Sequence, residues 1–408
     1  MKHIPYGKST LPVDLPPSVS VEWVTPREAK PAANPLEITT QAIKNSPLYT
    51  FINVNSVSIA INDKTRPVPH QHLLPPLLEQ LGDKDITFVI ATGLHDPMPR
   101  EEFERILPAE IIEKYRVISH NAKDEDMVVY LGETSRGTPV FANKYFMDAD
   151  LRIVVGNIEP HQFMGFSGGV KSAAIGLAGA ATINHNHAMM IHENAALGQY
   201  KGNPARDDVE EIGQMLRVDF ALNAILNGKK QIVRVLAGYP VDVMHEGIPL
   251  VKAIYEVPVS APFDVIIASP GGHPKDINMY QAQKALAHAS KVMKPDGTVI
   301  LVAACPEGSG SDSYENWVAG KQSHEDVLDS FVREGFHVGP HKAFQLSRDS
   351  VKVRVLLVSE MPDELARKLL FHPIPSLDKA IEIALRDLPS NARIGVMPAA
   401  NATIAALK

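Results

Sequence analysis

The sequence predicts an α/β fold made of two α/β domains with mainly parallel sheets. Short runs of β-branched and aliphatic residues alternate with longer helical patterns, which is typical of chains built from βαβ units. Most of the short runs are apolar throughout, as expected of parallel strands that are buried on both faces. The chain has 408 residues, which at roughly 100–200 residues per domain suggests two or three domains.

The first expected strand follows a proline-rich stretch that ends near residue 40 and that we expect to wrap a surface or pair at a sheet edge. Apolar runs predict strands at residues 57–61, 86–90, 151–155, 232–236, 265–268, 298–303 and 351–358, with a last strand-like segment at 393–397. Helical patterns occupy residues 75–81, 100–106, 108–114, 206–216, 281–293 and 325–334. The helix at 75–81 begins with Pro75 and Pro76, which suit a first helical turn.

A domain boundary is expected at residues 256–262, where two prolines precede a new strand that starts at Phe263. We therefore expect a larger domain over residues 1–257 and a smaller one over 262–397. Residues 398–408 are then able to return to the first domain.

The composition limits the class of protein. A hydrophobic fraction of 45% and a charged fraction of 21% are ordinary for a soluble protein, and a net charge of -7 argues against a nucleic-acid partner. With no secretory-signal pattern and no run of about 18 apolar residues, we expect a cytoplasmic protein without a membrane partner. The one cysteine, Cys305, excludes disulfides within the chain, so imidazole and carboxylate groups would supply most protein ligands of a bound metal.

Polar clusters follow the expected strands, at the place where open α/β sheets bind ligands. The first cluster holds Asp63 and Arg66, and arginine suits bidentate capture of a carboxylate, although a solvated surface pair fits as well. The second holds His95 after a turn at Gly93, which places an imidazole for proton transfer or for a plain backbone contact.

The third cluster is a glycine-rich turn with a lysine, preceded by His161 and followed by a His-x-His pair. The turn reads Gly165-Phe-Ser-Gly-Gly-Val-Lys171, in which glycines would let backbone N–H groups approach an anion. It is not a Walker A motif, because Val170 stands where that motif needs glycine. The lysine is equally suited to be a covalent anchor, and the pair of His185 and His187 is a weak metal signal.

The fourth cluster follows the strand at 265–268 and enters a helix. Gln281 and Lys284 are three residues apart and share one helical face, although a solvated surface helix explains them too. Taken together, the clusters suit racemisation at a hydroxy-bearing carbon, because that reaction needs two acid–base groups and a cation that holds the substrate.

The motifs carry a resemblance to a known family. Asp-x-x-Arg-Pro, Thr-Gly-x-His, His-x-x-x-Gly-Phe-Ser-Gly-Gly-x-Lys, a later histidine and Gly-Gly-x-Pro-Lys-Asp-x-Asn-x-Tyr-Gln-Ala-x-Lys-Ala occur in this order. This arrangement closely resembles the nickel-pincer lactate racemase family from about residue 56 to residue 290. A departure follows the lysine, where Ser172-Ala-Ala-Ile-Gly lacks an expected proline, which leaves this segment less rigid.

The resemblance implies a cofactor, a reaction and a set of roles. The cofactor is the nickel-pincer nucleotide, a pyridinium-3,5-bisthiocarboxylic acid mononucleotide with Ni²⁺, attached covalently to Lys171. It accepts and returns the C2 hydride of a small 2-hydroxy acid in a cleft between the domains, and separate proteins make it and insert its nickel. By the same resemblance, His187 rather than His185 binds nickel, and the catalytic residues are His95 and His161. The resemblance also implies that the substrate is bound by Arg66, Gln281 and Lys284, and that the cofactor is contacted by Asp63, Tyr280 and Lys284. Phe344 is a loose match to an aromatic residue that lines the site in this family.

Other functions remain open at this point. The same cofactor chemistry would serve a sugar acid or a larger or dicarboxylic 2-hydroxy acid. An NAD-dependent oxidoreductase would need a Gly-x-Gly-x-x-Gly turn that opens a βαβ unit, and the sequence has none. A non-enzymatic nickel-binding protein would have no need of Arg66, His95 or the Lys171 anchor.

Overall fold

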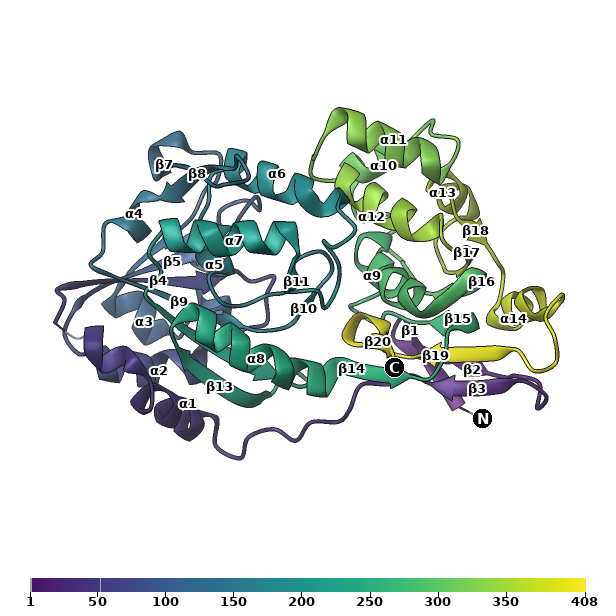
Figure 1. Ribbon diagram of the computed structural model, residues 1–408, viewed down its shortest axis with the longest axis horizontal. Coiled ribbons are helices and arrows are strands. Elements are labelled where there is room, and N and C mark those ends of the chain that lie inside the picture. The colour runs from purple at the N-terminus through teal and green to yellow at the C-terminus, as the bar shows by residue number, and fades with distance from the viewer. Residues whose placement is uncertain (1, 52) are drawn as a thin grey trace. The chain divides into compact units, whose positions relative to one another are not determined.

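The computed structural model describes residues 2–51 and 53–408 (Figure 1). The chain divides into two compact units. Residues 28–254 form one of them, the large unit, while residues up to 27 and 255–408 together form the other, the small unit. Both units are α/β with mainly parallel sheets, as the sequence predicts.

The large unit is built on a six-stranded sheet of order β13-β12-β9-β4-β5-β6. Its strands are β4 (Ser56–Asn62), β5 (Asp85–Ala91), β6 (Arg116–Ser119), β9 (Leu151–Asn157), β12 (Phe220–Leu226) and β13 (Ile232–Gly238). All neighbours pair in parallel except β13, which runs antiparallel to β12 at the edge. The carboxyl ends of β5, β4, β9 and β12 therefore meet at one edge of the sheet.

Helices cover both faces of this sheet (Figure 1). Alternate strand residues pack with α1 (Pro35–Lys44), α2 (His70–Leu81) and α3 (Ala109–Lys114) into one apolar core. The remaining helices are α4 (Lys144–Met147), α5 (Lys171–Ala174), α6 (Ala180–Ala188), α7 (Pro204–Met215) and α8 (Pro240–Tyr255). Two small antiparallel pairs complete the unit, β7 (Val128–Glu133) with β8 (Pro139–Asn143), and β10 (Pro160–His161) with β11 (Gly165–Phe166).

The small unit has a second six-stranded sheet, of order β18-β17-β16-β15-β19-β3, in which every pairing is parallel. Its strands are β3 (Ser20–Trp23), β15 (Phe263–Ala268), β16 (Met293–Val302), β17 (Arg354–Val358), β18 (His372–Pro373) and β19 (Arg393–Met397). Two further pairs are the hairpin of β1 (Lys2–Tyr6) and β2 (Ser9–Val13), and the parallel pair of β14 (Glu256–Val259) and β20 (Ile404–Leu407).

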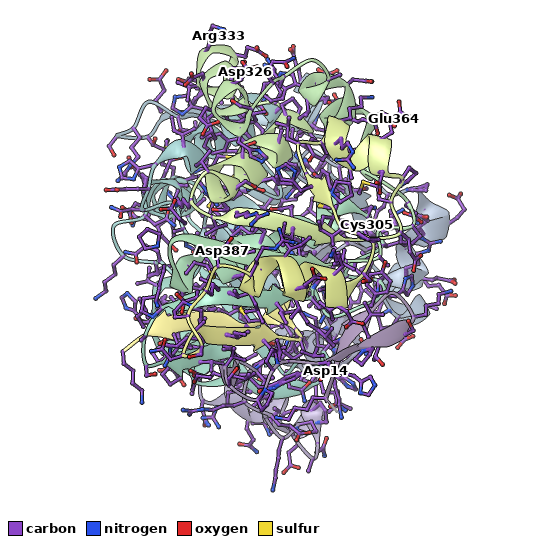
Figure 2. The ribbon with its side chains drawn as sticks, turned by 90° about the vertical axis from the view of Figure 1, so that its right-hand side faces the viewer. Asp14, Cys305, Asp326, Arg333, Glu364 and Asp387 are labelled. Carbon is purple, nitrogen blue, oxygen red and sulfur yellow. The ribbon has the colours of Figure 1, made fainter. Side chains whose placement is uncertain are left out.

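Two apolar layers sandwich this second sheet. One contains α9 (Met279–Ala289), α10 (Asp312–Val318), α11 (His324–Glu334), α12 (Pro340–Ser350) and α13 (Asp363–Lys368). The other contains α14 (Leu377–Leu385) and the β1–β2 hairpin, and Figure 2 looks onto α14, with Asp387 just beyond its end. No helix in the described ranges is long and apolar enough to cross a membrane.

The domain bounds differ from those expected. The proline-rich N-terminal stretch does pair at a sheet edge, but its strand β3 joins β19 of the small unit rather than the large one. The last residues form β20, which pairs with β14 in the small unit instead of returning to the large unit. Both expectations about the domain bounds were wrong for the same reason. A strand can pair with the open edge of another strand that is far away in the sequence.

Helix α2 is also longer than expected. It begins at His70, so Pro75 and Pro76 lie inside the helix rather than in its first turn. The apolar side chains of α2 are buried against the sheet, and this packing outweighs the cost of the prolines.

Candidate active site

The polar residues singled out in the large unit follow strands that lie side by side. Asp63 follows β4, His95 follows β5, and the loop to His161 leaves β9, on the other side of β4. Because the carboxyl ends of these strands share one edge, residues far apart in sequence are brought together there.

Asp63 and His95 form a hydrogen-bonded pair. His95 Nδ1 lies 2.8 Å from Asp63 Oδ2, and Thr65 donates to Oδ1 through its hydroxyl (2.6 Å) and its backbone N–H (3.2 Å). Burial acts to raise the pKa of Asp63, but the hydrogen bonds from His95 and Thr65 and the charges of His95 and Arg66 hold it below its ordinary value. The carboxylate accepts a hydrogen bond from Nδ1–H, so the basic nitrogen of His95 is Nε2, on a ring whose side chain is 54% exposed.

Arg66 is held by the same turn. Its backbone N–H donates to the Asp63 carbonyl (3.1 Å). Its guanidinium donates to the hydroxyl (3.1 Å) and the carbonyl (3.4 Å) of Thr65, and the residue is exposed. Arg66 and Asp63 do not form the ion pair that the sequence left open, because the carboxylate is engaged by His95 and Thr65. The guanidinium therefore remains accessible to an anionic ligand.

His161 has the opposite hydrogen-bonding pattern. It lies in β10 and pairs with Gly165 of β11, in a hairpin that turns through residues 162–164. The backbone N–H of Met164 donates to His161 Nδ1 (3.3 Å), so in the neutral ring the proton is on Nε2. Phe163 packs edge-on against this ring, with centroids 5.0 Å apart.

The lysine loop, residues 165–171, is tied to the sheet. The backbone N–H of Gly169 donates to Asn223 Oδ1 on β12 (2.8 Å), and the Ser167 hydroxyl donates to the carbonyl of Asn157 at the end of β9 (2.9 Å). Gly168 has a φ of +84°, and a Cβ there would come within 2.7 Å of Ile158. The glycines therefore allow an approach to the strands that a larger residue would prevent.

Lys171 begins α5 and is partly buried. Burial, and then the positive charges of Arg66 and Arg206, lower the pKa of its amine from 10.5 to about 7. The lowered pKa raises the fraction of uncharged amine at neutral pH, and an uncharged amine is a nucleophile. Val170, which breaks the Walker A pattern, is buried against Gly213 of α7 and so has a packing role.

The two histidines of α6 have different surroundings. His185 Nδ1 lies 2.8 Å from the Thr138 hydroxyl, which donates to the buried Asp208, so His185 belongs to a structural network. His187 packs against Phe163 (5.1 Å between centroids), which also contacts His161. Its Nδ1 lies 3.2 Å from Asn186 Oδ1, so Nε2 is the nitrogen suited to a metal. Among the described residues, no group of three or more His, Cys, Asp or Glu side chains is arranged to hold a metal ion.

The fourth cluster lies in the small unit, on the first turns of α9. Asn278 caps this helix by accepting the backbone N–H of Gln281 (3.1 Å). The Lys284 amine donates to Gln281 Oε1 (2.9 Å), which confirms that these side chains share a face. Tyr280 contacts Lys342 of α12, whose amine lies 4.7 Å from the ring centroid. The loosely matched Phe344 is buried in this unit and stacks on Phe331, with ring centroids 4.6 Å apart.

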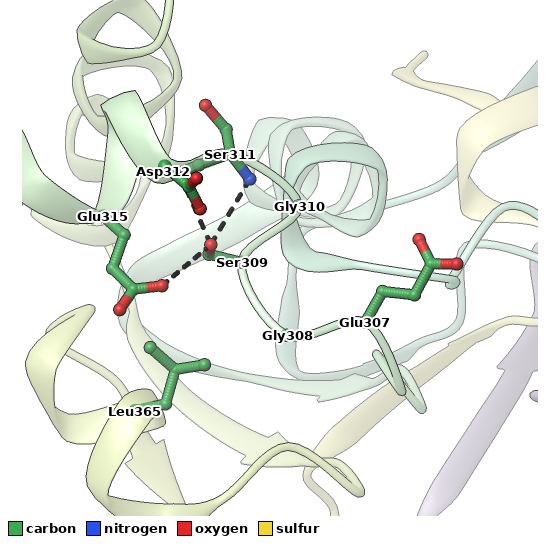
Figure 3. A pocket seen from close by; sticks show the side chains of 8 residues that line it. All are labelled: Glu307, Gly308, Ser309, Gly310, Ser311, Asp312, Glu315 and Leu365. Atoms are coloured by element: carbon green, nitrogen blue, oxygen red, sulfur yellow. Dashed lines mark hydrogen bonds between the residues drawn. The ribbon is translucent and has the colours of Figure 1, made fainter.

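A pocket of about 420 Å³ near the start of α9 does not contain the predicted residues (Figure 3). It is lined by Glu307, Gly308, Ser309, Gly310, Ser311, Asp312, Glu315 and Leu365. Its loop supports α9, because the carbonyls of Gly308 and Ser309 accept the backbone N–H groups of Met279 (2.9 Å) and Tyr280 (3.0 Å).

Sequence reasoning missed three residues of the large unit that position the site. Asn223 lies in the middle of a buried strand, Phe163 contacts two of the predicted histidines, and Arg206 is a buried cation behind the lysine loop. Asn223 and Phe163 carry no motif signal. The segment Asn203-Pro-Ala-Arg206 did carry a signal for a helix start, which is where α7 begins.

Known proteins match this chain along nearly its whole length. Models of the lactate racemase N-terminal domain and C-terminal domain match residues 6–198 and 259–405. The lactate racemase of Thermoanaerobacterium thermosaccharolyticum is 28% identical over 97% of this chain and 96% of its own length. That of Lactiplantibacillus plantarum is 30% identical over 84% of this chain and 83% of its own length.

A solved structure agrees with these matches. The lactate racemase apoprotein from T. thermosaccharolyticum superposes with a TM-score of 0.92 at 27% identity, covering 99% of each chain. The chain therefore belongs to the lactate racemase family and is an isomerase.

Proposed function

We propose that this protein is a nickel-pincer-dependent racemase or epimerase that inverts C2 of a small, lactate-like 2-hydroxy acid in the cytoplasm. The observation that carries the proposal is the pair of histidines beyond β5 and β9, one with a basic Nε2 and one with a protonated Nε2. A racemase needs such a pair, because each direction of reaction requires one group to take the hydroxyl proton and another to return it.

The residues around the lysine loop fit the implied cofactor. Lys171 supplies an amine with a pKa near 7 for a covalent link, and His187 supplies an imidazole nitrogen for nickel. The side-chain nitrogen of Asn157, at the end of β9, is buried without a hydrogen-bond partner in the described structure, which suits a polar ligand group. When bound, the cofactor would supply a carbon that accepts the C2 hydride of the substrate and returns it.

The chain's own side chains would bind the substrate and move its proton. Arg66, with its guanidinium exposed, binds the carboxylate, and Gln281 and Lys284 offer further polar contacts. His95 Nε2 removes the hydroxyl proton, and Asp63 stabilises the imidazolium that results. After C2 becomes planar, His161 returns a proton to the oxygen from its imidazolium form, which leaves a neutral imidazole. Proteins that make the cofactor and insert nickel would be its partners.

The test is intact-protein mass spectrometry with metal analysis, on protein co-expressed with the cofactor-making enzymes. We expect a nickel-containing adduct of mononucleotide size on the wild type and none on Lys171→Ala, while Lys123→Ala, which changes an exposed lysine, keeps the adduct. A panel of 2-hydroxy acids, including sugar acids and dicarboxylic acids, then identifies the substrate. Absence of both adduct and nickel under conditions that load a known lactate racemase would refute the proposal.

A further inference from the structure

Arg206 is a buried cation behind the lysine loop, with none of its surface exposed. It lies in the first turn of α7, where Asn203 caps the helix by accepting its backbone N–H (3.2 Å). Its guanidinium donates to the carbonyls of Phe166 (3.1 Å) and Gly168 (3.2 Å), on either side of Ser167. Because burial of a charge is costly unless its donors are satisfied, this side chain couples the loop tightly to α7.

The other edge of the guanidinium meets Glu210, one helical turn further on. Nε and one terminal nitrogen donate to Glu210 Oε1 (2.8 and 2.5 Å), and the Tyr200 hydroxyl donates to the same oxygen (2.9 Å). The ring of Tyr200 lies 5.2 Å from the guanidinium carbon. Arg206 is therefore held between a carboxylate on one side and the carbonyls of the lysine loop on the other.

Gly169 shows how closely the loop fits this cation. A Cβ at this position would lie 2.7 Å from Met244 Cγ and 3.1 Å from the guanidinium of Arg206. The φ of Gly169 is +57°, which also favours glycine. Lys171 follows two residues later, so the loop sets the place of its amine relative to Arg206.

The charged groups around Lys171 come from two elements. Arg66 acts from the loop after β4 and Arg206 from α7, and both oppose protonation of the amine. The nearby carboxylates are already engaged, since Asp63 pairs with His95 and Glu210 pairs with Arg206. The net effect at the amine is repulsion of a second positive charge.

We infer that Arg206 is a positioning residue for cofactor attachment, because its guanidinium holds the lysine loop by two carbonyls and so sets the place of the Lys171 amine. The inference rests on the proposed tethering of the cofactor to Lys171. It concerns the protein before the cofactor arrives, so it is tested on the apoprotein.

The experiment is competitive acetylation of the full-length apoprotein with trace acetic anhydride across a range of pH. Mass spectrometry follows the Lys171 peptide, with the exposed Lys123 as internal reference. For the wild type we expect the labelling of Lys171 to reach its midpoint near pH 7. Arg206→Met should raise this midpoint by about one pH unit and reduce labelling at pH 7 several-fold, since it removes a like charge.

Two further variants separate charge from structure. Glu210→Gln keeps an oxygen for Arg206 but removes the opposing charge, so the midpoint should fall. Arg206→Lys keeps the charge and should partly restore the midpoint. The matched control is Arg136→Met. Arg136 forms an ion pair with Asp207 (3.2 Å), the residue that follows Arg206 in the sequence, and its removal should leave the Lys171 midpoint unchanged.

An unchanged Lys171 midpoint in both Arg206→Met and Glu210→Gln, with both folded by circular dichroism, would overturn the inference. If Arg206→Met does not fold, Glu210→Gln decides alone. The proposed function fails separately, when the wild type forms no nickel adduct although its Lys171 titrates as described.

Discussion

His95 and His161 lie beyond strands β5 and β9, which flank β4 in one sheet. Their hydrogen-bond partners differ, so the ring proton of the neutral imidazole is on Nδ1 in His95 and on Nε2 in His161. Asp63 accepts a hydrogen bond from Nδ1–H of His95, which leaves Nε2 basic. The backbone N–H of Met164 donates to Nδ1 of His161, which leaves the proton on Nε2. One residue type thus provides a base and an acid, and the difference comes from a carboxylate in one place and an amide in the other.

The largest expected effect comes from removal of either histidine. His95→Asn and His161→Asn should each reduce racemisation by about 10⁴-fold in the loaded enzyme, because the full reaction needs both groups. His161→Asn keeps the base His95 and should still oxidise one enantiomer to bound 2-keto acid, whereas His95→Asn loses that base. Acid quench and mass spectrometry of the keto acid measure this half-reaction.

The two variants should therefore differ in whether they form keto acid. If both form keto acid from the same enantiomer, His95 is not the base and the comparison between the two histidines fails. Lys171→Ala provides the baseline, since it should form no keto acid from either enantiomer.

A smaller effect is expected from Asp63→Asn, which makes His95 resemble His161. The amide that replaces the carboxylate can donate to Nδ1, which moves the ring proton to Nε2 and removes the base. We expect kcat to fall by about 100-fold with little change in nickel content. Steady-state kinetics in both directions, with metal analysis of the same sample, measure this.

Thr65→Val should have a smaller effect than Asp63→Asn on the same carboxylate. It removes the hydroxyl donor to Asp63 Oδ1 but keeps the backbone donor, so the pKa of Asp63 should rise towards its ordinary value. Activity at neutral pH should change by less than about tenfold, with the acid limb of the pH profile moved upward. A loss of activity as large as that of Asp63→Asn would show that His95 depends on the conformation of the turn at residues 63–66 rather than on the charge of Asp63.

The fold was predictable where the signal is local. The continuous apolar runs that became β4, β5, β9 and β15 are direct marks of buried parallel strands. Strand β12 was missed because its alanines and leucines favour helix and Asn223 interrupts the run. The pairing of the N-terminal stretch with β19 depends on long-range contacts, so the sequence cannot show which sheet it joins.

For the site, motifs found the groups but not their partners. Asp63 and Arg66 looked like a pair in sequence, whereas the fold pairs Asp63 with His95 from the next strand. The choice between His185 and His187 came from the resemblance, and the structure adds a physical reason, since the ring of His185 is engaged by Thr138. Such partners lie on separate strands and helices, where periodicity and spacing carry no information.

Two buried histidines outside the site, His70 and His288, show how a hydrogen-bond partner of the ring affects the stability of the protein. His70 in the large unit and His288 in the small unit are 1% and 3% exposed, and burial lowers the pKa of each from 6.5 to about 4. Each Nδ1 lies beside a backbone carbonyl, of Ile106 (2.9 Å) and Thr403 (2.8 Å), rather than a carboxylate. A buried imidazole with such a partner stays neutral, because burial disfavours its charged form.

The sign of the pH dependence follows from the lowered pKa values. The unfolded chain binds a proton at each histidine below pH 6.5, while the folded protein does not until the pH nears 4, so stability is complete above 6.5 and falls between these values. Between pH 7 and 5, each histidine should cost about 2 kcal/mol of unfolding free energy. Urea denaturation at the two pH values should therefore show a smaller acid loss for His288→Gln and for His70→Gln, while His3→Gln, at an exposed position, retains the full loss. Equal losses in all three variants would mean that other groups carry the acid sensitivity, and that a buried histidine beside a carbonyl does not differ from an exposed one.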